Sequence, residues 1–129
     1  MGQIYLVRHG QASFGSADYD RLSDVGVQQA RLLGEWYAER RQGFSRVITG
    51  GMNRHRQTAV ACLGALPRNL RKEGDWETDA GFAEYDHDQI IARHRPEFAD
   101  VGALQRFLAE SENPREAFQA NFEAAMARW

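Results

Sequence analysis

The residues best suited to chemistry follow the first apolar run of the chain. Ile4 to Val7 is a run of four apolar residues, which predicts a short buried strand. Arg8, His9 and Gly10 come directly after it, at the strand end where open α/β sheets place their ligands. The arginine supplies a fixed positive charge, the histidine a nucleophilic ring nitrogen, and the glycine a close approach of the backbone. We therefore expect a phosphate group to bind here.

A second set of basic residues follows another predicted strand, residues 44–49. Two glycines come next, and a helix is predicted from about residue 52 to residue 66, where Pro67 ends it. The carboxyl ends of parallel strands meet at one edge of a sheet, so Arg54 can reach His9. We also expect free N–H groups at the start of this helix to favour an anion. Arg56 is two positions further and points to another face of the helix.

An acidic loop precedes the second half of the chain. Glu84 and Asp86 lie in this loop, just before a predicted helix over residues 88–95. Carboxylates in this position usually cap a helix or are solvated. A metal site could also be drawn from four nearby side chains: Asp86, His87, Asp88 and His94. Their spacing matches no specific zinc or iron pattern, so we expect no metal ion.

The predicted elements that must position these residues alternate along the first half of the chain. Ser23 or Asp24 is a suitable N-cap for a long helix that Gly43 ends, with Gly34 inside it. A weakly signalled third strand falls at residues 70–73. Strands alternating with helices predict a parallel sheet covered by helices. The second half shows only helical periodicity, over residues 88–95, 101–110 and 114–129, and Pro114 suits a first helical turn.

Composition narrows the class of protein further. The chain has 129 residues, a length typical of one domain, with 43% hydrophobic and 26% charged residues. Its net charge of −2 argues against binding nucleic acid through bulk charge. A single cysteine, Cys62, excludes an internal disulfide and fits a reducing compartment. No stretch is long enough to cross a membrane. We expect a cytoplasmic protein with no nucleic-acid or membrane partner.

Two ordered motifs resemble the histidine phosphatase (phosphoglycerate mutase-like) superfamily. Residues 6–11 read Leu-Val-Arg-His-Gly-Gln, and residues 22–30 read Leu-Ser-Asp-Val-Gly-Val-Gln-Gln-Ala, which together are similar to the opening signature of the family. Residues 52–59 read Met-Asn-Arg-His-Arg-Gln-Thr-Ala and look like its second block. Residues 82–86 contain Glu84 where the family carries an acidic residue. The resemblance covers about residues 3–90.

The resemblance implies a role for each candidate residue. His9 would be the nucleophile that takes up the phosphoryl group, while Arg8 and Arg54 would hold its oxygens. Glu84 would donate a proton to the leaving oxygen, which requires a raised pKa or a proton from the bound phosphate, and Asp86 is the alternative. Gly10 and Gln11 would line the pocket, and no metal or cofactor is needed. The substrate would be a phosphorylated small molecule or a phosphoprotein.

Departures from the family pattern qualify these expectations. Residues 12–15 read Ala-Ser-Phe-Gly where a mutase carries Ser-x-x-Asn, which favours a phosphatase over a sugar-phosphate mutase. No His-Gly pair follows Glu84, although the family completes its pocket with a histidine in a late strand. We therefore expect residues 1–129 to form a single three-layer α/β/α domain that lacks the C-terminal part of the fold. The alternative is a weakly active or inactive phosphate-binding or assembly fragment, whose open sheet edge would favour homo-oligomers.

Overall fold

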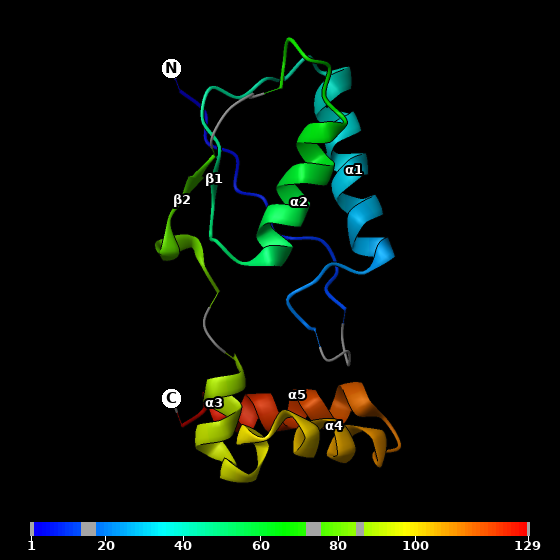
Figure 1. Ribbon diagram of the computed structural model, residues 1–129, viewed down its shortest axis with the longest axis vertical. Coiled ribbons are helices and arrows are strands. Elements are labelled where there is room, and N and C mark those ends of the chain that lie inside the picture. Colours follow the sequence, from blue (N-terminus) through cyan, green and yellow to red (C-terminus); the bar gives the residue numbers. More distant parts are fainter. Residues whose placement is uncertain (1, 14–17, 72–75, 85–86, 129) are drawn as a thin grey trace. The chain divides into compact units, whose positions relative to one another are not determined.

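A computed structural model of the chain describes residues 2–13, 18–71, 76–84 and 87–128 (Figure 1), without the side chains of His87, Asp88 and Val101. The chain divides into two compact units, residues 1–84 and 85–129. The first combines helices with a small parallel sheet, and the second is entirely helical in its described part. The structure is therefore of the α/β class, with all its described strands in the first unit.

Two packed helices form the core of the first unit. The helix α1 spans Asp24–Glu39 and begins at Ser23, whose hydroxyl accepts a hydrogen bond from Gly26 N, as predicted for an N-cap. The helix α2 spans Asn53–Gly64, close to the predicted range. Gly34 has a packing role, because a Cβ atom there would lie 2.0 Å from the carbonyl oxygen of Cys62 on α2. The helices therefore pack more closely than any side chain at position 34 would allow.

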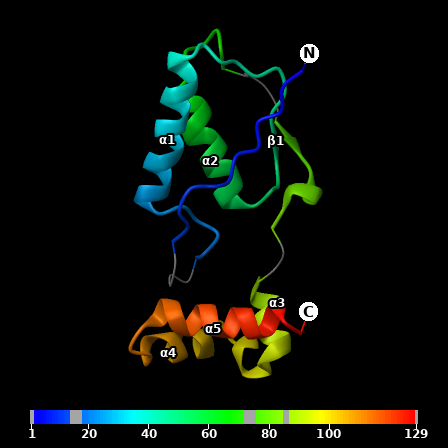
Figure 2. The ribbon, with the colours of Figure 1, turned by 180° about the vertical axis from the view of Figure 1, so that it is seen from behind.

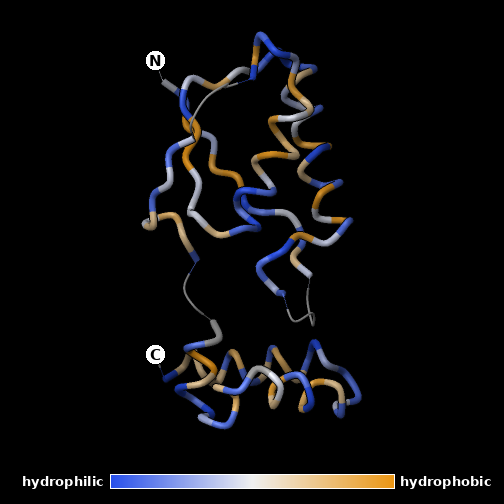
Figure 3. Tube along the Cα trace, viewed as in Figure 1, coloured by the Kyte–Doolittle hydropathy of each residue, from blue (hydrophilic) through white to orange (hydrophobic). Residues whose placement is uncertain are grey.

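The buried side chains of these helices are apolar. Both helices carry alternating hydrophilic and hydrophobic stretches, as amphipathic helices do (Figure 3). The core cluster consists of five buried residues: Ala30, Tyr37, Cys62, Leu63 and Leu66. Cys62 is a free, buried thiol, and burial raises its pKa. This cysteine therefore acts as a small hydrophobic core residue, as its apolar sequence surroundings suggest.

The sheet is smaller than the sequence predicts. Its strands are β1, Ile48–Thr49, and β2, Glu77–Thr78, which pair in parallel with Ile48 opposite Glu77. The predicted strand over residues 44–49 is thus shortened to its last two residues. The strand predicted at residues 70–73 is wrong for residues 70 and 71, which form a turn and a bend, while residues 72 and 73 lie outside the described part. The sequence pattern predicted the helices more accurately than these short strands, because the periodicity of the strands is weak.

The first apolar run does not form the predicted buried strand. Residues 4–7 have no ladder partner among the described residues, and Ile4 and Leu6 are 88% and 84% exposed. Exposure alternates along the run, since Tyr5 and Val7 are less exposed at 38% and 46%. This alternation is typical of an extended chain packed on one side only. The N-terminal trace lies between β1 and α2 in both views (Figures 1 and 2).

The second unit is a small helical assembly. Its helices are α3 (His87–His94), α4 (Val101–Ala109) and α5 (Pro114–Met126), and the 3₁₀ helix η2 (Pro96–Ala99) lies between α3 and α4. All three agree with the predicted ranges to within a few residues, and Pro114 lies in the first turn of α5 as expected. The buried side chains are Ile90, Ile91, Phe98, Leu108 and Ala125. No helix in the described part of the chain combines the length and apolar character of a membrane span.

Candidate active site

Three of the predicted site residues meet in the first unit. The Nε2 atom of His9 lies 2.9 Å from one carboxylate oxygen of Glu84, and Nη2 of Arg54 donates to the other at 2.8 Å. The side chains of His9 and Arg54 are 9% and 3% exposed, whereas that of Glu84 is 43% exposed. Glu84 therefore bridges two nearly buried groups from the solvent side. An incoming anion that sought the same two nitrogens would have to replace this carboxylate.

The other ring nitrogen of His9 fixes the tautomer. Its Nδ1 atom lies 2.6 Å from the carbonyl oxygen of Gly10. Because a carbonyl oxygen can only accept a hydrogen bond, Nδ1 must carry a proton. A neutral His9 ring therefore has its lone pair on Nε2, the atom that faces Glu84. The contact at 2.9 Å then needs one proton between Nε2 and the carboxylate.

A close backbone contact holds the segment that carries His9. A Cβ atom at Gly10 would lie 2.2 Å from the carbonyl oxygen of Gly26, so only glycine fits here. The amide of Gly10 donates to Oγ1 of Thr58 at 3.1 Å, and the Thr58 hydroxyl donates to the carbonyl of Arg54 at 2.8 Å. Thr58 thus joins the two motifs, and its spacing of four residues from Arg54 allows the second bond.

The start of α2 is capped by a residue from a distant loop. The N-cap Met52 makes no capping hydrogen bond with its side chain. Instead the carboxylate of Asp20 accepts from the backbone amides of Asn53 at 2.9 Å and Arg54 at 3.1 Å. The expectation of free N–H groups for a substrate anion is therefore wrong for these two amides. An acidic side chain already occupies the positive end of the helix.

Arg54 is held at both ends of its guanidinium group. Its Nη1 atom donates to Asp20 at 3.1 Å, opposite the Nη2 bond to Glu84. Burial raises the pKa of Glu84, but the Arg54 hydrogen bond and the charges of His9 and Arg54 outweigh it, so the net pKa is lowered. The pKa of Asp20 is likewise lowered, since hydrogen bonds from α2 and the Arg54 charge outweigh its desolvation. Both carboxylates thus favour their charged forms in this arrangement.

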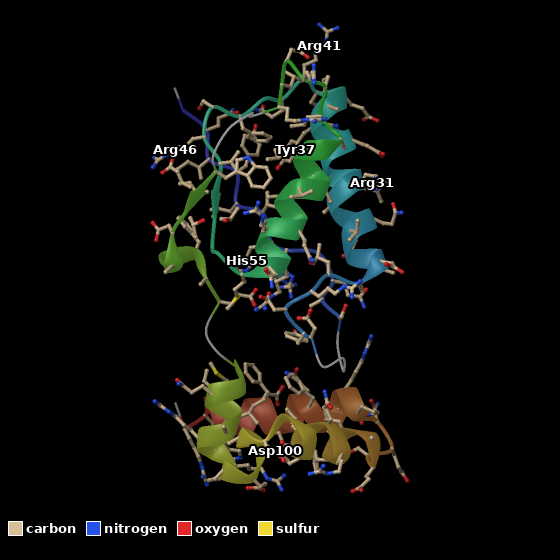
Figure 4. The ribbon with its side chains drawn as sticks, viewed as in Figure 1. Arg31, Tyr37, Arg41, Arg46, His55 and Asp100 are labelled. Atoms are coloured by element: carbon tan, nitrogen blue, oxygen red, sulfur yellow. The ribbon has the colours of Figure 1, made fainter. Side chains whose placement is uncertain are left out.

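A second imidazole lies beside the first. The ring of His55 is centred 5.9 Å from that of His9, and its Nδ1 atom is buried with no hydrogen-bond partner among the residues that the structure describes. Figure 4 shows His55 at the amino-terminal end of α2. Burial lowers the pKa of His55, and the positive charge of Arg54 lowers it further. The ring is therefore neutral near pH 7 and adds no charge next to Arg54.

Arg8 and Gln11 are placed differently from the three central residues. Arg8 is exposed and makes no hydrogen bond or ion pair with the part of the chain that the structure describes. It continues the more exposed side of the extended run, with Ile4 and Leu6, whereas His9 lies on the less exposed side. Gln11 is exposed too, and its backbone contacts the start of α1. The structure does not bring Arg8 into the cluster, so its phosphate-binding role stays a prediction.

The arrangement can be compared with known families. The model of the histidine phosphatase superfamily (branch 1) matches residues 4–129 of this sequence. The chain belongs to the histidine phosphatase superfamily. This confirms the resemblance carried by the two motifs, and it extends the match into the helical second unit.

Curated relatives of this chain match over a shorter region. Proteins named "Probable phosphoglycerate mutase GpmB" from Yersinia pestis (strain Pestoides F) and Yersinia pseudotuberculosis serotype O:1b (strain IP 31758) are each 34% identical over 65 residues. The matched region is 46% of this chain and 29% of each relative, so the chain covers less than a third of their length. No solved structure matches the chain with comparable significance. The superfamily includes both phosphatases and phosphoglycerate mutases.

Sequence reasoning missed several residues of this candidate site. Asp20 carried no motif signal, since a lone aspartate in a polar loop is common. Gln57 belongs to the second motif, and its side chain accepts from the amide of Leu22 at 2.8 Å, which anchors the loop that carries Asp20. Asp86 lies outside the described residues, so nothing is learned of it. Across the described residues no group of three or more His, Cys, Asp or Glu side chains is arranged to hold a metal ion.

Proposed function

We propose that this chain carries the phosphoryl-transfer site of a phosphomonoester hydrolase that works through phospho-His9 and needs no metal ion. One observation supports it most: the proton on Nδ1 is held by Gly10, so the lone pair of neutral His9 lies on Nε2, beside Glu84 and Arg54. A nucleophile next to an acid and a fixed cation is what phosphoryl transfer to an imidazole requires.

The shared proton suggests how the site is activated. When a phosphate ester displaces the Glu84 carboxylate, the proton between Nε2 and Oε1 leaves with Glu84 as its carboxylic acid. Nε2 is then free to attack phosphorus, and the bond from phosphorus to the ester oxygen breaks. The leaving oxygen takes the proton from Glu84. In the resting site the lowered pKa of Glu84 disfavours its protonated form. The proton that Glu84 takes from Nε2 supplies this form when the substrate binds.

The second half of the reaction restores the site. Glu84, now a carboxylate, accepts a proton from a water molecule that attacks the phosphorus of phospho-His9. The P–N bond breaks, inorganic phosphate leaves, and the Nε2 lone pair is restored. Glu84 can then share its proton with Nε2 as before. Arg54 neutralises oxygen charge in both steps, and Arg8, on its exposed segment, would swing in to hold the outer phosphoryl oxygens.

A mutase is the second candidate, because the curated relatives are named phosphoglycerate mutases. The sequence Ala-Ser-Phe-Gly at positions 12–15 favours the hydrolase. Incubation with 3-phosphoglycerate, followed by ³¹P NMR, separates the two. The hydrolase releases inorganic phosphate, whereas a mutase produces the isomeric ester. A phosphorylated small molecule and a phosphoprotein side chain are both substrates that we propose to test.

The wider organisation is also a proposal. We infer that both units belong to one histidine-phosphatase domain, because the family match spans them. In the whole protein this domain would form three α/β/α layers in the cytoplasm, with further strands paired beside residues 4–7. The exposed Ile4 and Leu6 support a role for that segment as a strand with a missing neighbour. The same exposed apolar surface would favour association between copies of this chain into homo-oligomers.

The direct test is turnover of p-nitrophenyl phosphate with a chelator present. The wild-type chain should release phosphate, and His9→Gln should reduce the rate by at least a thousandfold, to the background. Turnover that survives His9→Gln would exclude the mechanism. A wild-type chain that neither turns over the ester nor traps phosphohistidine would instead favour the alternative of an inactive phosphate-binding or assembly fragment.

A further inference from the structure

Asp20 connects the loop before α1 to the start of α2. Its Oδ2 atom accepts from the amide of Asn53, and its Oδ1 atom accepts both from the amide of Arg54 and from Nη1 of the Arg54 side chain, at 3.1 Å each. One carboxylate thus makes three hydrogen bonds, all to two successive residues of the helix. Such bonds to a charged acceptor are stronger than neutral ones.

The loop that carries Asp20 is itself anchored. Ala12 and Leu22 form an isolated antiparallel bridge that closes the loop, and Leu22 also donates to the side chain of Gln57 on α2 at 2.8 Å. Both Ala12 and Leu22 are buried. Asp20 is therefore held near α2 by contacts that do not depend on its own side chain.

The contacts of Asp20 have a consequence for Arg54. An arginine side chain has several rotatable bonds, so the direction of its guanidinium group must be fixed by partners. Asp20 takes Nη1, and this leaves Nη2 directed toward Glu84 and the neighbouring His9. When a substrate anion displaces Glu84, the bond to Asp20 remains. Arg54 then keeps its direction at the moment when its other partner is lost.

We propose that Asp20 is a positioning residue, which acts through Arg54 to keep one guanidinium nitrogen aimed at the phosphoryl group held at His9. The inference rests on the proposed function of His9 and Arg54 and extends it to a residue outside both motifs. In the described part of the chain the hydrogen bonds of Asp20 go to Asn53 and Arg54 rather than to His9 or Glu84, and Asp20 need not touch the substrate.

The obvious variant, Asp20→Asn, has two effects that must be separated. It removes the charge that holds Arg54, and it weakens the cap of α2, which alone would lower stability by about 1 kcal/mol. Met52→Ser supplies a local cap, because serine is favoured at the N-cap and Met52 makes no capping bond of its own. The double variant Asp20→Asn with Met52→Ser should therefore recover Tm without recovering the orientation of Arg54.

The experiment compares wild type, Met52→Ser and the double variant by KM and kcat for p-nitrophenyl phosphate. Isothermal calorimetry of inorganic phosphate binding is a readout that needs no turnover. In the double variant we expect KM and the Kd for phosphate to rise about tenfold, with a smaller change in kcat. In the background of Arg54→Lys, which cannot bridge Asp20 and Glu84, the same change should have little further effect. Arg56→Lys, on the exposed side of α2, is the matched control.

Each outcome decides one question. If the double variant recovers both Tm and phosphate affinity, Asp20 is only a cap and the proposal is overturned. Additive effects of the Asp20 and Arg54 substitutions would overturn it too. A wild-type chain that binds phosphate but neither turns over the ester nor forms phosphohistidine contradicts the proposed hydrolase alone, since the calorimetric comparison still tests Asp20. A wild-type chain that binds no phosphate contradicts both.

Discussion

Oε1 of Glu84 is 2.9 Å from Nε2 of His9, and this pair must share a proton because the opposite ring nitrogen donates to the carbonyl of Gly10. The relationship gives one carboxylate two tasks. It holds the nucleophile in its resting state, and it removes the proton that would prevent attack. The exposed side of Glu84 is where a substrate would enter, because His9 and Arg54 are almost fully buried behind it.

The first prediction concerns Glu84→Gln. The amide can still accept a hydrogen bond from Arg54, but it cannot donate a proton to the leaving group. We expect kcat/KM for alkyl phosphates, which reports the phosphorylation step, to fall by about 10²–10⁴-fold. The loss in kcat/KM should be smaller for p-nitrophenyl phosphate, whose leaving group needs no acid. Glu77→Gln is the control, since Glu77 pairs with the exposed Arg46. Equal losses for both ester types would rule out general acid catalysis by Glu84.

A second prediction concerns Arg8, which the structure leaves exposed. If Arg8 swings in to bind phosphoryl oxygens, Arg8→Gln should raise KM by roughly tenfold or more, as expected for losing a charged hydrogen bond of about 1.5–3 kcal/mol. Tm should stay unchanged, because Arg8 has no hydrogen bond or ion pair with the described residues. Kinetics and thermal unfolding on the same preparation check this. An unchanged KM would remove Arg8 from the site.

The third prediction is a dependence of stability on pH. Folding lowers the pKa of His55, so the folded chain disfavours the protonated ring. The stability that depends on neutral His55 is present above its ordinary pKa of 6.5 and is lost as the pH falls through the lowered value. Tm should therefore drop between pH 7 and pH 5, by roughly 4–8 °C for each kcal/mol lost.

His55→Gln should remove much of that drop, because glutamine does not titrate. Arg56→Gln, one residue further along α2, should leave it unchanged. A second loss is expected as the pH falls below the ordinary pKa values of Glu84 (4.5) and Asp20 (3.8), because folding lowers the pKa of both carboxyl groups and the unfolded chain takes up these protons first. A drop between pH 7 and pH 5 that survives in His55→Gln would show that another group causes it.

The fourth prediction concerns the glycine that follows His9. Gly10→Ala should destabilise the first unit by about 1–3 kcal/mol or more, because the new methyl group would meet the backbone of Gly26, which cannot move without shifting α1. Gly64→Ala is the matched control: a Cβ atom there meets nothing within 4 Å. It should leave stability unchanged or raise it by up to about 1 kcal/mol. Chemical unfolding measures both, and a Gly10→Ala chain as stable as Gly64→Ala would contradict the close contact.

Helices were predicted well from the sequence, and the sheet was not. The N-cap Ser23 and the stop at Pro67 are local signals, so they survive in any tertiary setting. The run Ile4–Val7 has strand composition, but a strand also needs a partner. That partner is set by distant residues, and none is paired with the run in the described part of the chain.

The site shows the same division between local and distant causes. The parallel arrangement of successive strand ends indicated that Arg54 would reach His9, and the family resemblance indicated Glu84. Asp20 could not be found this way, since its partners lie 33 and 34 residues further along the chain. His55 was recognised as one of several basic residues, but its neutral, buried environment follows only from packing beside His9.

Trapping the phosphorylated chain tests the central claim most directly. The chain is mixed with a phosphomonoester and a chelator and quenched in alkali, where phosphohistidine survives; mass spectrometry and ³¹P NMR then locate the phosphoryl group. We expect it on Nε2 of His9, because Nδ1 is occupied by its bond to Gly10. Phosphate on Nδ1, on His55 or on any other side chain, or turnover that leaves His9 unlabelled, would contradict the mechanism.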